Sequence, residues 1–228
     1  MTIVAVHQPQ FLPWLGYFDK IDRADVFVLL DTVQFKKNEW QNRNRIKTAQ
    51  GPRWLTVPVR YKFPQRINQV PVNNTVNWQH KHRQALLSNY RKAPCFDSLG
   101  DFFEEILSTP WEFISPLNIT VVKRLAGHLG IDTPIHVASE LGDFPEDPDE
   151  RLIAITRYFD GDTYLAGSGG RQYMRLDAWA KSGVHVLFQD YRHPVYDQLF
   201  GDFEPFLSVI DLIFNHGEES LAILRGET

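Results

Sequence analysis

The sequence predicts an α/β fold in which a mostly parallel sheet is flanked by helices. Two short apolar, β-branched runs, 2–6 and 26–30, are typical of buried strands. Between them, residues 16–24 carry apolar side chains at helical spacing. A strand, a helix and a second strand form a crossover unit, and its two strands are parallel.

The remaining segments extend this pattern into a single α/β domain over residues 1–228. Its middle third is expected to be a helical insert at about 78–130. Further strands are predicted at 53–59, 134–138, 163–166 and 184–189. Helices are predicted at 78–91, 97–107, 116–129, 146–159, from the loop at 167–170 to about 182, and at 208–214.

Composition narrows the class of protein. The chain has 228 residues, 43% of them hydrophobic, and a formal net charge of −4, so no global attraction to nucleic acid is expected. Cys95 is the single cysteine, which excludes an intramolecular disulfide and a multi-cysteine metal site. The start lacks a basic leader, and no apolar run approaches the ~20 residues of a membrane helix. A soluble, cytoplasmic protein is therefore expected.

Polar side chains follow the first two strands, where ligands of open α/β sheets bind. His7 comes at the end of the first strand and is the main candidate for a catalytic general base. Asp31 follows the second strand and could bind a sugar or base hydroxyl. The predicted substrate-binding residues in this part of the chain are Gln8, Gln10, Trp14, Tyr17, Asp31 and Gln34.

A segment rich in amides and cations follows. In an extended chain, Arg43, Arg45 and Lys47 would share one face. Asn42, Arg43, Asn44 and Lys47 are predicted to bind phosphate or carboxylate groups, as a flap that turns back at 51–52. The alternative is a solvated strand face. We expect His7, Gln34, Arg43 and Ser168 to line one cleft.

A glycine-rich loop between a strand and a helix is the second candidate site. Glycines allow backbone N–H groups to approach an anion. The predicted phosphate-binding residues are Ser168, Gly169, Gly170, Arg171 and Tyr173. The alternative is a tight turn that needs positive φ. The loop is not a P-loop, because no Gly-Lys-Ser or Gly-Lys-Thr follows.

Two histidines precede the middle helices. His80 and His82 differ by two positions and cannot face the same way on a helix, which argues against a metal pair. His82 is a second catalytic candidate, and Lys81 a substrate contact. Zinc-ligand spacing and a two-metal carboxylate cluster are absent, so no metal and no cofactor are expected.

Four motifs together resemble the WbqC-like protein family of bacteria, over nearly the whole chain. They are residues 7–17, 31–35, 40–44, and 167–170 with Tyr173. The resemblance implies an association with O-antigen and other surface polysaccharides, because some members are associated with such genes.

A more distant similarity is to the nucleotidylyltransferase and class I synthetase (HUP) superfamily, which implies a Rossmann-like sheet. Residues 14–17 occupy the place of its His-x-Gly-His motif, but both histidines are missing. In that superfamily they stabilise charge on the transferred phosphate. Their absence argues against nucleotidyl transfer, while the fold can persist.

These observations favour a transferase that moves a small acyl or aminoacyl group onto a nucleotide-activated sugar. Its expected partner is a nucleotide sugar or another phosphorylated small molecule. One alternative is a binding or scaffolding module with interface aromatics Trp40, Trp54 and Trp78. Another is a nucleotidyl-binding or aminoacyl-tRNA-using enzyme with tRNA as partner. A homodimer is a further open alternative.

Overall fold

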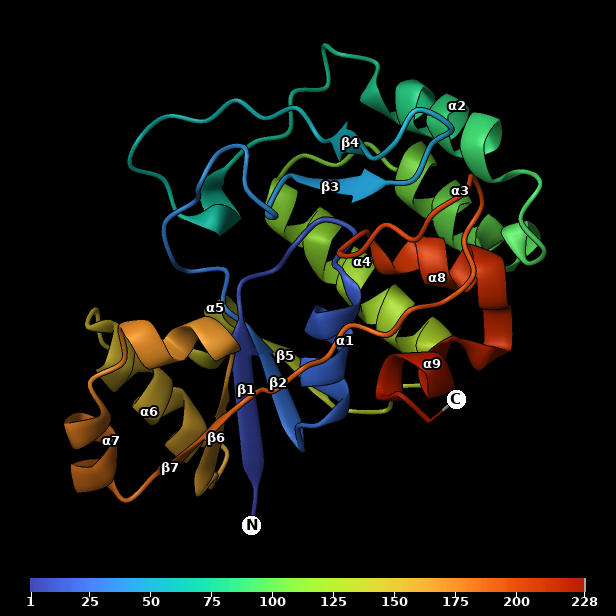
Figure 1. Cartoon of the computed structure of the whole chain (residues 1–228). Coiled ribbons are helices and arrows are strands. Elements are labelled where there is room, and N and C mark those ends of the chain that lie inside the picture. Colours follow the sequence, from blue (N-terminus) through green and yellow to red (C-terminus); the bar gives the residue numbers. More distant parts are fainter. Residues whose placement is uncertain (228) are drawn as a thin grey trace.

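A computed structural model describes residues 1–227 and contains a five-stranded sheet in the order β5-β2-β1-β6-β7 (Figure 1). All of its strand pairs are parallel. The predicted α/β, Rossmann-like fold is confirmed. The strands are β1 (Ile3–His7), β2 (Val26–Leu29), β5 (Ile135–Val137), β6 (Thr163–Ala166) and β7 (His185–Phe188).

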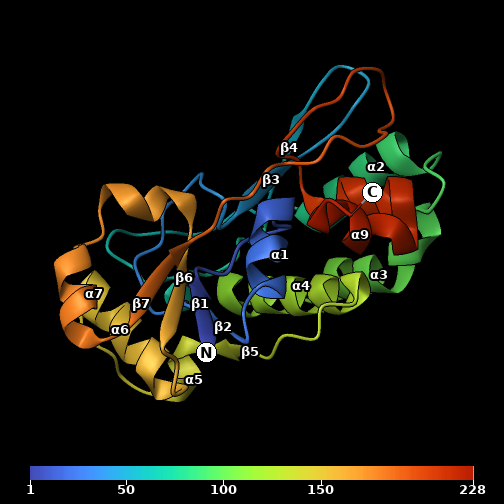
Figure 2. The same ribbon diagram turned by 60° about the horizontal axis from the view of Figure 1, so that its bottom comes forward.

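Helices cover both faces of this sheet, as Figure 2 shows most clearly. Side chains of β1 alternate between two apolar layers: Ala5 joins one, whereas Val4 and Val6 join the other. The first layer contains α1 (Leu15–Asp22), α4 (Ile114–Leu129), α8 (Val209–His216) and α9 (Ser220–Arg225). The second contains α5 (Ala138–Leu141), α6 (Pro148–Tyr158) and α7 (Leu176–Ser182).

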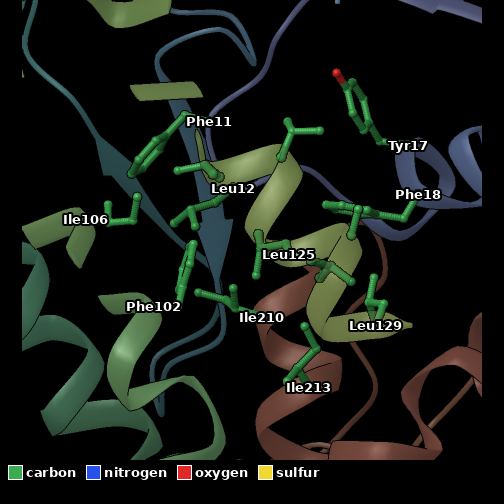
Figure 3. Packing of buried hydrophobic residues seen from close by; sticks show 14 of the residues in the cluster. Phe11, Leu12, Tyr17, Phe18, Phe102, Ile106, Leu125, Leu129, Ile210 and Ile213 are labelled. Atoms are coloured by element: carbon green, nitrogen blue, oxygen red, sulfur yellow. The ribbon is translucent and has the colours of Figure 1, made fainter. Parts of the chain in front are cut away.

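The first layer is the larger core. Figure 3 shows Phe11 and Leu12 packed among side chains of α3 (Gly100–Ser108), α4 and α8. Both residues come from the loop directly after β1, and both are almost completely buried. Burying two large side chains fixes this loop in place. The polar residues 7–10, which precede them, are thereby held at the carboxyl end of β1.

The middle of the chain is helical, close to the predicted ranges. It contains α2 (Trp78–Tyr90), η2 (Phe96–Leu99), α3 and α4. Helix α4 ends at Gly130, whose φ of 79° is left-handed and suits glycine. Apolar side chains of these helices belong to the same cluster as α1 and the sheet. That residues 78–130 are an insert within one domain stays a prediction.

A separate two-stranded sheet stands apart from the main one (Figure 1). Strands β3 (Arg43–Ile46) and β4 (Arg53–Thr56) are antiparallel, with Arg43 opposite Thr56. The predicted turn at 51–52 is present, and Thr48 and Gly51 exchange backbone hydrogen bonds there. A short 3₁₀ helix, η1 (Ile67–Gln69), follows the hairpin.

Candidate functional site

A cavity of about 430 Å³ opens at the carboxyl ends of β1 and β6. We call it the strand-edge cavity. It brings together residues from the loop after β1, from α1, and from the glycine-rich loop after β6. The predicted site residues that line it are His7, Gln8, Trp14, Tyr17, Ser168, Gly169, Gly170 and Tyr173.

His7 is held as a neutral imidazole in this cavity. Its Nδ1 lies 3.2 Å from the carbonyl oxygen of Gln8, so Nδ1 carries the proton and donates it. Burial lowers the pKa of His7 to about 3, and the positive charge of Lys20 contributes to the lowering. At neutral pH the unprotonated Nε2 is therefore available to accept a proton. Tyr17 supports the same backbone turn, since its hydroxyl donates to the Gln8 carbonyl over 3.1 Å.

Lys20 is a cavity residue that the sequence analysis missed. It lies on α1 and is only 3% exposed. Its Nζ donates to the Val6 carbonyl oxygen at 2.9 Å, and the Tyr164 ring centre is 5.7 Å away. Within residues 1–227 no carboxylate forms an ion pair with it. Burial consequently lowers the pKa of Lys20 to about 7. A lysine at helical spacing from Tyr17 on a buried helix was the available signal.

The electrostatic character of the cavity follows from its lining. In the described part of the chain, no aspartate or glutamate lines it, whereas Lys20 does. The nearest acidic group on α1, Asp19, instead accepts a hydrogen bond from Gln189 Nε2 at 2.5 Å. Gln189 also donates to the Gly16 carbonyl oxygen and so joins the end of β7 to α1. The cavity lacks negative charge and suits an anion.

The glycine-rich loop lies along the cavity as a short 3₁₀ helix, η3 (Ser168–Gln172). The helix predicted from this loop to about residue 182 does end there, but α7 begins only at Leu176. A side chain at Gly170 would meet Met174 Sδ at 2.8 Å, whereas Gly169 faces open space. Ser168 is exposed and lines the cavity, so its hydroxyl can bind a ligand. Arg171 is directed elsewhere, with its guanidinium carbon 4.3 Å from the Phe188 ring centre.

Three predicted residues near the first two strands lie outside the cavity lining. Asp31 is buried and accepts hydrogen bonds from the Ser115 and Ser139 hydroxyls, which joins the ends of β2 and β5 to α4 and α5. Gln10 is buried, and its Oε1 has no partner within 1–227. Gln34 is exposed and pairs through its backbone with Arg66.

The amide-rich segment is largely internal rather than a flap over the cavity. Asn42 donates to the Val57 carbonyl oxygen and Asn44 to the Leu12 carbonyl oxygen. Lys47 Nζ contacts the Gln198 Oε1 and the carbonyl oxygens of Gly201 and Asp202. Their hydrogen bonds are therefore made inside the protein.

The expected single cleft is only partly present. His7 and Ser168 share the strand-edge cavity, but Gln34 and Arg43 do not line it. The guanidinium carbon of Arg43 instead lies 4.2 Å from the Trp54 ring centre. Arg43 is the first residue of β3, and the β3–β4 hairpin forms a sheet separate from the one that carries His7.

Lys81 and His82 line a second cavity, of about 650 Å³, between β4 and α2. His82 Nε2 donates to the Thr56 carbonyl oxygen at 3.2 Å, and burial lowers the pKa of His82 to about 4. His7 and His82 line different cavities, so the two do not share a site. Trp78 also differs from expectation, because it is buried in the core rather than exposed.

A model of the WbqC-like protein family matches residues 8–223. The chain belongs to the WbqC-like protein family. This WbqC-like chain is also 35% identical, over 229 residues, to "Uncharacterized protein Rv1507c" of Mycobacterium tuberculosis; the alignment covers 99% of this chain and 98% of that protein. No solved structure matches. Membership of the family suggests involvement in polysaccharide biosynthesis.

Two further properties of the WbqC-like chain concern its partners. Across residues 1–227, no group of three or more His, Cys, Asp or Glu side chains is arranged to hold a metal ion. Among the described helices, none has the length and apolar character needed to cross a membrane.

Proposed function

We propose that this protein binds a nucleotide-activated sugar in the strand-edge cavity and transfers a small acyl or aminoacyl group onto it. The product would serve the assembly of a bacterial surface polysaccharide of the O-antigen type, in the cytoplasm. The observation that carries the proposal is the buried Lys20, which has no carboxylate partner within 1–227 and lines the same cavity as the glycine-rich loop.

The proposal rests on electrostatic fit. A buried ammonium without a counter-ion is unfavourable, and a bound phosphate group would supply the missing negative charge. The Ser168 hydroxyl and the open backbone at Gly169 could donate hydrogen bonds to the phosphate oxygens. A phosphate bound beside Lys20 would also raise the pKa of its ammonium, so that ligand and lysine stabilise each other.

His7 is the proposed general base of the transfer. An amine or hydroxyl of the sugar would attack the carbonyl carbon of the acyl donor. A new C–N or C–O bond forms as the bond to the leaving group of the donor breaks. The proton of the attacking group would pass to His7 Nε2 and then to the leaving group. A bound phosphate favours this step, because negative charge raises the pKa of His7 from its low resting value.

A thermal-shift screen tests the binding step. At a hundredfold excess over its dissociation constant, a ligand stabilises the native state by ~2.7 kcal/mol. We expect at least one nucleotide sugar to raise the unfolding midpoint of the native chain. Lys20→Met should reduce this shift, whereas Lys123→Met, on an exposed position of α4, should keep it in full. A screen without any shift, or an equal shift in Lys20→Met, would contradict the proposal.

A product assay separates the enzyme from a binding or scaffolding module. The nucleotide sugar found in the screen is incubated with acyl thioesters and with aminoacyl-tRNA, and the sugar is analysed by mass spectrometry. The enzyme predicts a mass increase that disappears in His7→Asn. Binding with no mass increase from either donor class would favour the non-enzymatic module.

A further inference from the structure

The second cavity, between the β3–β4 hairpin and α2, has the features of a ligand site of its own. We call it the hairpin groove. Its volume of about 650 Å³ is within the range of small-molecule sites, and none of its lining residues also lines the strand-edge cavity. Strand β4 supplies one wall with Arg53 and Trp54, and α2 supplies the other with Lys81 and Gln84.

Trp54 provides an aromatic surface at this groove. The side chain is 45% exposed, which is unusual for so large an apolar group. Its position is nevertheless fixed. Arg43 places its guanidinium carbon 4.2 Å from the ring centre, and Trp40 lies 5.6 Å away, ring centre to ring centre. A tryptophan that is held in place but remains accessible can stack on a flat ligand.

The charges of the groove select the ligand class. Arg53 and Lys81 line it, and within residues 1–227 neither pairs with a carboxylate. No aspartate or glutamate is found among the described lining residues. These two cations favour an anionic ligand over a neutral sugar. An anion with a flat aromatic part can pair with the two cations and stack on Trp54.

Polar groups of α2 complete the lining. Gln84, Ser88 and Asn89 contribute amide and hydroxyl groups along the groove. Base edges and a ribose carry the complementary donors and acceptors. His82 stays neutral beneath them, because its Nε2–H donates to the Thr56 carbonyl oxygen, so it adds no competing charge.

We propose that the hairpin groove binds a nucleotide, with the base stacked on Trp54 and the phosphate held by Arg53 and Lys81. The ligand chemistry is an aromatic base that bears a phosphate. It can come from a free nucleotide or from the end of an RNA strand. This site does not depend on the function proposed for the strand-edge cavity.

The test is calorimetric titration of the full chain, in wild type and in the Lys20→Met variant, which removes the cation of the other cavity. The probes are AMP, UMP, ribose 5-phosphate and a single-stranded RNA trinucleotide. Lys20→Met should still bind AMP or UMP, because the lining of its hairpin groove is unchanged. Trp54→Ala should weaken binding roughly five- to 150-fold, because stacking of a base on an aromatic side chain contributes ~1–3 kcal/mol. Tight binding of the trinucleotide alone would identify an RNA end as the source.

A charge variant and a folding control keep the test decisive. The double variant Arg53→Gln, Lys81→Gln should lose affinity for AMP but not for adenosine. Circular dichroism melting should show that Trp54→Ala folds, since the residue is exposed. The proposal is overturned if ribose 5-phosphate binds as tightly as AMP, if folded Trp54→Ala keeps the wild-type affinity, or if neither nucleotides nor RNA bind.

Discussion

The strand-edge cavity and the turn end of the β3–β4 hairpin each bury one lysine, and the two lysines have opposite surroundings. Lys20 and Lys47 are equally buried, at 3% exposure. Lys47 reaches three oxygen atoms of the 198–202 loop. Lys20 reaches one backbone oxygen and otherwise faces a cavity.

The difference distinguishes buried polar groups whose hydrogen bonds stabilise the fold from those that can still bind a ligand. Around Lys47 the network continues, because its backbone N–H donates to the Tyr90 hydroxyl, and Tyr90 donates to Asp211 at 2.7 Å. Tyr196 donates to the other oxygen of Asp211. The hydrogen bonds of that region are made internally. Around Lys20 they are incomplete, and a ligand can complete them.

Substitution of the two lysines by methionine should change the free energy of unfolding in opposite directions. The larger change, a loss of stability, is expected at Lys47 in the hairpin. Lys47→Met leaves carbonyl oxygens of the 198–202 loop unpaired and removes a cation near Asp211. Losing hydrogen bonds donated by a charged group costs roughly 1.5–3 kcal/mol each in the free energy of unfolding. Urea denaturation measures the loss, and an unchanged midpoint would show that the network is not structural.

Lys20→Met should instead stabilise the protein in a pH-dependent way. The pKa of Lys20 is about 7 when folded, below the ordinary 10.5, so the unfolded chain binds more protons between these values. Wild-type stability therefore rises with pH across that window, and the ammonium is most unfavourable below pH 7. The gain from Lys20→Met should be roughly 2–3 kcal/mol larger at pH 6 than at pH 9. A gain that is equal at both pH values would mean that Lys20 has an ordinary pKa.

Asn44 is a second buried polar residue whose hydrogen bonds are expected to stabilise the fold. Its amide donates to the Leu12 carbonyl oxygen at 2.5 Å and accepts from the Arg45 backbone N–H at 2.7 Å. Asn44→Ala leaves the buried Leu12 carbonyl unpaired and should cost about 1–3 kcal/mol. Ligand affinity, measured on the folded fraction, should stay at the wild-type value. If Asn44→Ala kept full stability but lost ligand binding, Asn44 would be a ligand-binding residue and not a structural one.

The smallest expected effects come from two neighbouring glycines of the cavity loop. Gly170→Ala places a methyl group 2.8 Å from Met174 Sδ and 3.3 Å from the Phe188 ring. The flexible Met174 must move, at a cost of roughly 1 kcal/mol. Gly169→Ala meets nothing within 4 Å, so the fold should tolerate it within about 0.5 kcal/mol. Thermal melts compare the pair, and equal melting temperatures would contradict this packing.

The sequence predicts much of the sheet because the period of apolar residues is local. The runs predicted at 2–6 and 26–30 form neighbouring parallel strands, and Gly130 ends a helix, as expected. The role of Asn44 could not be predicted in this way. The side-chain amides and cations that bind phosphate are the same residue types that form hydrogen bonds to buried backbone groups. In addition, the hydrogen-bond partner of Asn44, Leu12, is 32 positions away in the sequence.

Lys20 was missed for a related reason. One lysine on a short helix is ordinarily exposed, with its charge in water. Its burial is decided by the sheet beneath α1 and by the glycine-rich loop, which comes about 150 residues later in the chain. In contrast, the convergence of His7 and Ser168 was predictable, because both follow parallel strands at one edge of the sheet.

The central claim is that Lys20 binds an anionic ligand in the strand-edge cavity. Proton uptake on ligand binding tests this claim most directly. The nucleotide sugar found by thermal shift is titrated calorimetrically at pH 8 in buffers of different ionisation enthalpy. Free Lys20, with a pKa of about 7, is mostly neutral at this pH, and a bound diphosphate should protonate it. The account predicts uptake of about one proton in wild type and none in Lys20→Met. Binding to wild type without proton uptake, or equal uptake in Lys20→Met, would contradict it.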